Sequence, residues 1–111
     1  MRAWLSVLAL ALAASACRDA EPPVRAGPYA DYCTRRAQCE GGNHRDINAC
    51  QASVAGTIAQ AEAFGCRDVY TAMLQCLMRG ARCAQRHYGA NCAAQLAAAN
   101  ACIAAGSAAS R

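Results

Sequence analysis

From residue 28 onward, the apolar positions recur every three or four residues, which is the spacing of amphipathic α-helices. Glycines interrupt this pattern at intervals, and no stretch alternates between apolar and polar residues with period two. The pattern therefore predicts an all-α fold, a small bundle of about four short helices in two helical hairpins, and gives no support for strands. The expected helices lie within 28–41, 46–65, 68–80 and 91–106.

Residues that cap helices flank these segments. Asp46, Asp68 and Asn91 each precede an apolar stripe and are expected to be N-caps, because their short polar side chains accept hydrogen bonds from the free amides of a first turn. Each expected helix runs into a glycine, the residue that most readily follows a helix C-terminus. Residues 29–106 therefore form one helical domain, followed by a short tail at 107–111.

The N-terminal segment has a different pattern. Met1-Arg2 supplies a positive charge, an apolar run from Ala3 to Ala14 is interrupted only by Ser6, and Ala14-Ser15-Ala16-Cys17 follows. This is the layout of a secretory signal peptide, and the apolar run is too short to span a bilayer. We expect residues 1–16 to be removed. An ordinary signal peptidase would leave Cys17 as a free thiol.

The same four residues at 14–17 resemble the lipobox of bacterial lipoproteins, although Ala14 stands where that family usually has leucine. The resemblance implies that Cys17 receives acyl chains, which would hold the chain at a membrane. Inner-membrane retention signals of that family commonly have Asp next, whereas this chain has Arg18. The resemblance therefore favours the outer membrane of a Gram-negative envelope, with the protein facing the periplasm or the cell surface.

Cysteine parity supports lipidation. The chain has nine cysteines, and assigning Cys17 to lipid leaves eight, an even number that can pair completely in an oxidising compartment. Residues 17–28 are polar and rich in proline, a composition typical of a tether. The mature part has one Phe and no Trp, so its core is thin and we expect four disulfides to stabilise it.

Two cysteine intervals are identical, Cys66-x9-Cys76 and Cys92-x9-Cys102. If the last two helices pack antiparallel, Cys66 faces Cys102 and Cys76 faces Cys92 in a single register, so both bridges can form together. The interval resembles the twin Cys-x9-Cys hairpin of coiled-coil-helix–coiled-coil-helix proteins, which pair in the same way, although Cys83 in the turn departs from that pattern. The mature chain as a whole resembles uncharacterised cysteine-rich predicted lipoproteins of myxobacteria, which implies no activity.

The remaining four cysteines admit three pairings. We favour Cys39–Cys50, across the short glycine loop between the first two helices, which leaves Cys33–Cys83 to join the two hairpins.

Catalytic and metal-binding patterns are weak. The mature part has three serines, none in a nucleophile-elbow context, so we expect no enzyme activity. Structural zinc sites use closer cysteine pairs than the shortest interval here, Cys33-x5-Cys39. Cys83-x3-His87, with His44 as the other imidazole, is the alternative metal site. We favour a bridged Cys83 and a solvated His87, and we expect no metal and no other cofactor.

The formal net charge is +4, the basic residues are all arginine, and they are spread along the chain, which argues against nucleic acid as a partner. Arg79, Arg82 and Arg86 cluster after the third expected helix. We favour the interpretation that they stabilise a helix C-terminus; the alternative is contact with anionic headgroups. The sequence thus predicts a non-enzymatic lipid-anchored module that contacts an unidentified envelope protein, with carriage of a small apolar ligand as the alternative.

Overall fold

The computed structural model describes residues 20–110. The expected signal peptide and Cys17 lie outside them. The described residues form four α-helices and one two-stranded antiparallel hairpin, joined by four disulfides, so the prediction of a small helical disulfide-rich fold is confirmed. In chain order the elements are α2 (Ala30–Glu40), α3 (His44–Ala63), α4 (Arg67–Gly80), β1 (Arg82–Ala84), β2 (His87–Gly89) and α5 (Ala93–Ala109).

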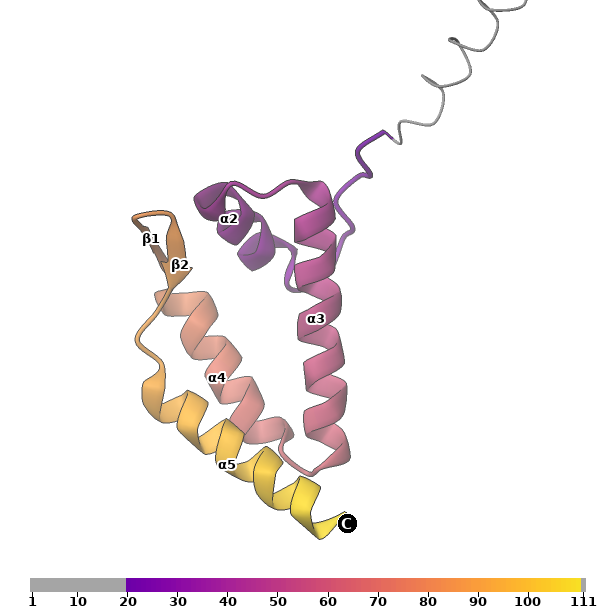
Figure 1. Ribbon diagram of the computed structural model, residues 1–111, viewed down its shortest axis with the longest axis vertical. Helices are drawn as coiled ribbons and strands as arrows, with labels where there is room; N and C mark the ends of the chain where they lie inside the picture. Colours follow the sequence, from indigo (N-terminus) through magenta and orange to yellow (C-terminus); the bar gives the residue numbers. More distant parts are fainter. Residues whose placement is uncertain (1–19, 111) are drawn as a thin grey trace, which may run out of the picture.

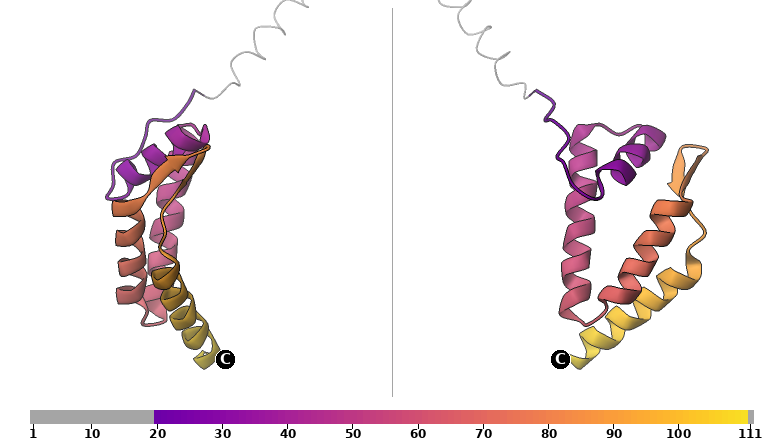
Figure 2. Two further views of the ribbon diagram at one scale, coloured as in Figure 1. Left: turned by 90° about the vertical axis from the view of Figure 1, so that its left-hand side faces the viewer. Right: turned by 180° about the vertical axis from the view of Figure 1, so that it is seen from behind.

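The helices form an open frame rather than a parallel bundle (Figure 1). α3 and α4 are arranged as a V and meet at a tight turn around Gly65, whose φ of 72° is left-handed. α5 packs along α4, while α2 packs against the opposite end of α3. The hairpin lies beside α2, as both further views show (Figure 2). The hairpin, α2 and the start of α3 therefore share one end of the molecule, which we call the hairpin end.

α3 begins earlier than the sequence predicts. Its N-cap is Asn43, whose side chain accepts hydrogen bonds from the amides of Arg45 and Asp46. Asp46 is the third residue of the helix, and its carboxylate accepts a hydrogen bond from the Asn43 amide at 2.8 Å. The prediction that Asp46 is the N-cap was therefore wrong: the two residues form a reciprocal capping box.

The other two expected N-caps were also wrong. α4 follows Cys66 and α5 follows Cys92, and neither N-cap residue makes a side-chain capping bond. Asp68 lies inside the first turn of α4, where its charge is favourable to the helix dipole. Asn91 precedes the cap of α5. Both true cap positions are bridged cysteines, so a disulfide fixes the start of each helix.

Three of the four expected stops hold. Gly41, with φ of 81°, is the left-handed C-cap of α2, Gly65 follows α3, and α4 ends at Gly80. Gly106 instead lies inside α5, which continues to Ala109. Most of the expected tail at 107–111 is therefore helical.

The prediction that the chain lacks strands was wrong. β1 and β2 pair antiparallel, with Cys83 opposite Tyr88. The two turn residues, Gln85 and Arg86, have φ of 50° and 62°, as a two-residue type I′ hairpin requires. Each strand has only three residues, too few to show an alternating pattern.

The core is thin and divided. One cluster of buried residues lies between α3, α4 and α5, and the other between α2 and α3. The first contains Ala61, Cys66, Tyr70, Met73, Leu74 and Ala99, and the second contains Cys33, Ala37 and Ile47. Among the described residues, Tyr29 alone packs against both. So little buried apolar area makes the disulfides essential to stability.

Candidate interaction surface at the hairpin end

The disulfides of the α4–α5 pair are those that the sequence predicts. Cys66 is joined to Cys102 and Cys76 to Cys92, with Cα separations of 5.9 and 6.0 Å. The two helices run antiparallel, so equal spacing along each brings both pairs into register.

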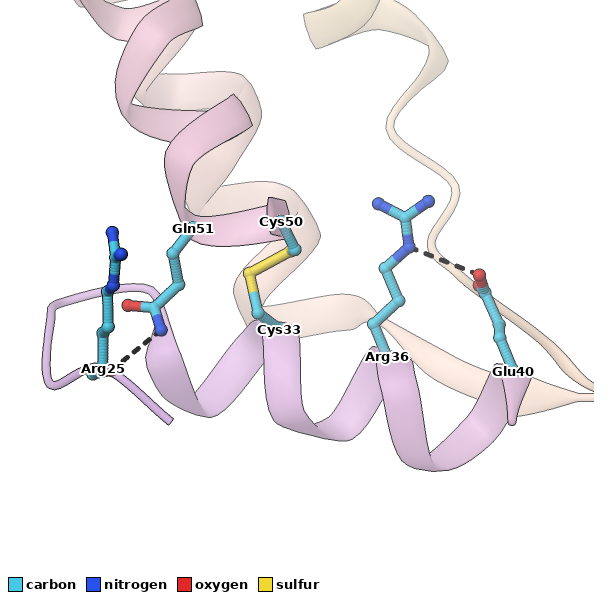
Figure 3. The surroundings of a disulfide bond; sticks show 6 residues. All are labelled: Arg25, Cys33, Arg36, Glu40, Cys50 and Gln51. Atoms are coloured by element: carbon cyan, nitrogen blue, oxygen red, sulfur yellow. Dashed lines mark hydrogen bonds and ion pairs between the residues drawn. A yellow bond between two sulfur atoms is a disulfide. The ribbon is translucent and has the colours of Figure 1, made fainter. Parts of the chain in front are cut away.

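The predicted pairing of the other four cysteines, Cys39–Cys50 and Cys33–Cys83, was wrong. The structure joins Cys33 to Cys50 and Cys39 to Cys83. The chain reverses at Gly41-Gly42, and Cys33 lies eight residues before Gly41 while Cys50 lies eight residues after Gly42. These two positions therefore face each other across the reversal (Figure 3). Cys39 is too close to the turn to reach Cys50, and it lies beside the hairpin instead.

The proline-rich segment before α2 is held against α3. The Glu21 carboxylate accepts a hydrogen bond from the His44 amide at 2.8 Å, and His44 Nδ1 lies 2.9 Å from the Pro22 carbonyl oxygen. Asn48 accepts from the Arg25 amide and donates to the Pro23 carbonyl.

Gln51 donates a further hydrogen bond to the carbonyl oxygen of Arg25 in this segment, drawn in Figure 3. Val24 packs against the cluster between α2 and α3. We call residues 21–25 the strap. Within the expected tether at 17–28, the strap is fixed to the domain by side chains of α3.

The hairpin is fixed to α2 by three different interactions. Cys39 and Cys83 form a disulfide, and the rings of Tyr32 and Tyr88 lie 5.6 Å apart between centroids. The Glu40 carboxylate accepts a hydrogen bond from the Tyr88 amide at 3.2 Å. The hairpin is therefore positioned by covalent, aromatic and charged contacts together.

Two ionisable groups at this end are perturbed. The hydrogen bond from the Tyr88 amide, assisted by Arg36, lowers the pKa of Glu40 below its ordinary value of 4.5. Arg36 Nε lies 3.4 Å from the Glu40 carboxylate, and a dashed line marks this ion pair in Figure 3. Partial burial raises the pKa of the Tyr32 phenol above 10.0. Glu40 is thus held in its charged form as the link between α2 and β2.

The three clustered arginines occupy different elements. Arg79 lies in the last turn of α4, as a helix-end cation should. Arg82 belongs to β1 and Arg86 to the hairpin turn, so a helix dipole does not account for them. All three side chains are exposed, and none pairs with a carboxylate of residues 20–110.

Open hollows mark the surface of residues 20–110. One, of about 460 Å³, lies between α2 and α3 and includes Arg36, Glu40 and Asp46. Another lies between α2 and the hairpin and includes Arg35 and Arg82. The third, of about 270 Å³ between α4 and α5, is mainly apolar and is lined by Met73, Leu77 and Leu96. Leu96 is the large apolar side chain that is most exposed in the described part of the chain, at 48%.

Two of the three residues of the alternative metal site have other partners, and the third is exposed. The Cys83 sulfur is bonded to Cys39, His44 contacts the strap, and His87 is exposed on β2. Between residues 20 and 110, no three His, Cys, Asp or Glu side chains lie close enough together to hold a metal ion.

Comparison with protein-family models, with curated proteins and with solved structures finds no match for this chain. The fold defines a small helical disulfide-rich protein, and its four disulfides fit an exported, non-cytoplasmic one. None of the helices within 20–110 has the length and apolar character needed to cross a membrane.

Proposed function

We propose that this chain is a lipid-anchored protein of the bacterial envelope, a module that acts by contact and not by catalysis. The observation that carries the proposal is the completeness of the bridges. The four disulfides pair every cysteine of residues 20–110: Cys33, Cys39, Cys50, Cys66, Cys76, Cys83, Cys92 and Cys102. The cysteine that remains of the nine is Cys17, which directly follows the lipobox-like residues Ala14-Ser15-Ala16.

The exposed end of the domain supports a contact function. A disulfide, a tilted tyrosine pair and a charged hydrogen bond fix the hairpin in one orientation. A surface held in this way loses little conformational entropy when it binds, which favours recognition of a partner. In this proposal the protein has two partners, the membrane, which it reaches through acyl chains on Cys17, and another envelope protein. Arg18 favours the outer membrane.

Carriage of an apolar ligand is the weaker alternative. The hollow formed by Met73, Leu77 and Leu96 is mainly apolar, but its volume is about 270 Å³ and it is open to solvent. Ligand pockets usually enclose about 300–1,000 Å³ and cover most of their ligand. A carrier should take up an apolar fluorescent probe saturably in the oxidised state, and a contact module should not.

The intact mass of the protein from a Gram-negative envelope tests the anchor. We expect a lipid-sized addition on a chain that begins at Cys17, with eight alkylation sites that appear only after reduction. An unlipidated chain would overturn the anchor. Thiols that react before reduction would overturn the assignment of four complete bridges.

A further inference from the structure

The hairpin end has more arginines than carboxylates. The carboxylates there have internal partners: Asp31 pairs with Arg35, Glu40 with Arg36, Glu21 accepts from the His44 amide and Asp46 from the Asn43 amide. The arginines without a carboxylate partner among residues 20–110 are Arg25, Arg45, Arg79, Arg82 and Arg86. Glu21 and Asp46 accept only from backbone amides and keep their charge, so five arginines outnumber two carboxylates and this end is positively charged.

The opposite end of the molecule has a different charge. At the turn between α3 and α4, Arg67 pairs with Glu62, and Asp68 is left over. α5 contains no charged residue. Within residues 20–110 the positive charge is thus concentrated at the hairpin end, whereas the sequence alone suggests that it is spread along the chain.

The strap makes the chain leave the domain at the same end. The hydrogen bonds of Glu21, Asn48 and Gln51 fix residues 21–25 along the first turns of α3. In Figures 1 and 2, the indigo start of the described chain lies beyond the N-terminal end of α3, on the side away from the turn between α3 and α4, with α2 between it and the hairpin. The direction in which the chain reaches Cys17 therefore follows from contacts within the domain.

The chain between the strap and Cys17 is short. Four residue steps separate Cys17 from Glu21, and even a fully extended chain covers at most about 14 Å in four steps. A lipid on Cys17 would therefore hold the hairpin end, and not the turn between α3 and α4, next to the membrane surface.

We propose that the hairpin end binds the anionic phosphate headgroups of the membrane that carries the anchor, with Arg82 and Arg86 in contact with them. The proposal rests on the proposed lipid anchor for its location, while the charge and the strap supply its orientation. Near an anionic surface each arginine strengthens binding roughly fivefold. The strap and hairpin thus convert a lipid anchor into a fixed docking orientation.

The test uses single tryptophan reporters, because the only natural tryptophan, Trp4, lies in the expected signal peptide. A84W places the reporter on β1, and A105W places it on the exposed face of α5. The lipidated protein is reconstituted into phosphatidylcholine vesicles containing about one third phosphatidylglycerol. A lipid with a nitroxide on its headgroup then quenches whichever reporter lies at the surface.

We expect quenching of A84W and little quenching of A105W. The A84W quenching should weaken when phosphatidylglycerol is omitted, and also at about 1 M salt, where the screening length falls to about 3 Å. R82Q should lower the equilibrium constant for docking of the hairpin end roughly fivefold and R82Q/R86Q should lower it further, whereas R67Q, which removes one charge at the far end, should leave it unchanged.

Equal quenching of the two reporters, or quenching of A84W that is independent of phosphatidylglycerol, would overturn the docking orientation. A second hairpin reporter, H87W, covers the case in which A84W disturbs the strand. If the mass measurement shows no natural lipid, the same reporters are read after a maleimide lipid is coupled to the Cys17 thiol. Loss of the natural anchor and loss of the orientation therefore give different results.

Discussion

Gly106 of α5 lies against Phe64, the residue that ends α3, so closely that a Cβ on Gly106 would stand 2.6 Å from the Phe64 Cβ and 3.1 Å from its carbonyl oxygen. No ordinary side-chain contact is this short. The glycine therefore lets α5 cross the end of α3, and this contact, not a helix stop, explains a glycine at position 106.

The first prediction concerns this contact. Gly106→Ala should destabilise the oxidised protein, because overpacking costs about 1–3 kcal/mol and exceeds the gain of up to about 1 kcal/mol in helix propensity. Gly56→Ala is the matched control, since a Cβ there has open space around it within α3. It should stabilise by about 0.5–1 kcal/mol. Denaturant midpoints measure both; a stabilised G106A variant would contradict the close approach.

Reduction of the disulfides should unfold the domain. Closing the loop from Cys66 to Cys102, a separation of 36 residues, contributes about 4 kcal/mol in the chain-entropy model. Domains of this size have a total stability of only about 5–15 kcal/mol. Far-ultraviolet circular dichroism with and without reductant checks this. A fully helical spectrum in reductant would show that the two small clusters suffice without bridges.

Release of the strap is the third prediction. Asn48→Ala removes the hydrogen bonds to Arg25 and Pro23, each worth about 0.5–1.5 kcal/mol net. Together the two bonds are worth about 1–3 kcal/mol, so trypsin cleavage after Arg25 should become roughly five- to 150-fold faster. Asn100→Ala, on the exposed face of α5, is the matched control and should leave the rate unchanged. An equal rate in N48A and the unaltered protein would mean that the strap is not held by Asn48.

The fourth prediction follows from the lowered pKa of Glu40. A carboxyl group whose pKa is lower in the folded than in the unfolded state stabilises the fold above the unfolded value of 4.5. That stabilisation is lost as pH falls through the lowered folded value. We therefore expect the attachment of β2 to α2 to weaken on acidification below 4.5.

The NMR shift of the Tyr88 amide, followed as pH is lowered, measures this attachment. Glu40→Gln keeps the size of the side chain but removes its charge, so the transition should disappear in E40Q. A Tyr88 transition that persists unchanged in E40Q would assign it to another group.

The helices could be predicted from sequence because each has an apolar stripe, and the α4–α5 bridges because Cys66, Cys76, Cys92 and Cys102 repeat one interval. The hairpin could not. Its strands are too short for a pattern, and its turn uses Gln85 and Arg86 where glycine or asparagine is usual. The arginines of that hairpin therefore looked like helix-end cations.

The strap was also hidden from sequence reasoning. A segment rich in proline and polar residues is typical of a tether, and its contacts join backbone groups to the side chains of Asn48 and Gln51, about 25 residues further along. Such contacts produce no periodicity. The Cys33–Cys50 bridge did have a usable signal, the equal distance of both residues from the reversal at Gly41-Gly42.

The Cys39–Cys83 disulfide, which joins the two halves of the protein, determines what happens when the backbone is cut. Cys33–Cys50 joins α2 to α3, while Cys66–Cys102 and Cys76–Cys92 join α4 to α5, so each half of the protein is stapled to itself. Cys39–Cys83 alone spans the two halves. A protease that nicks the chain between residues 51 and 65 would therefore leave a two-chain protein that separates only when this one bond is reduced.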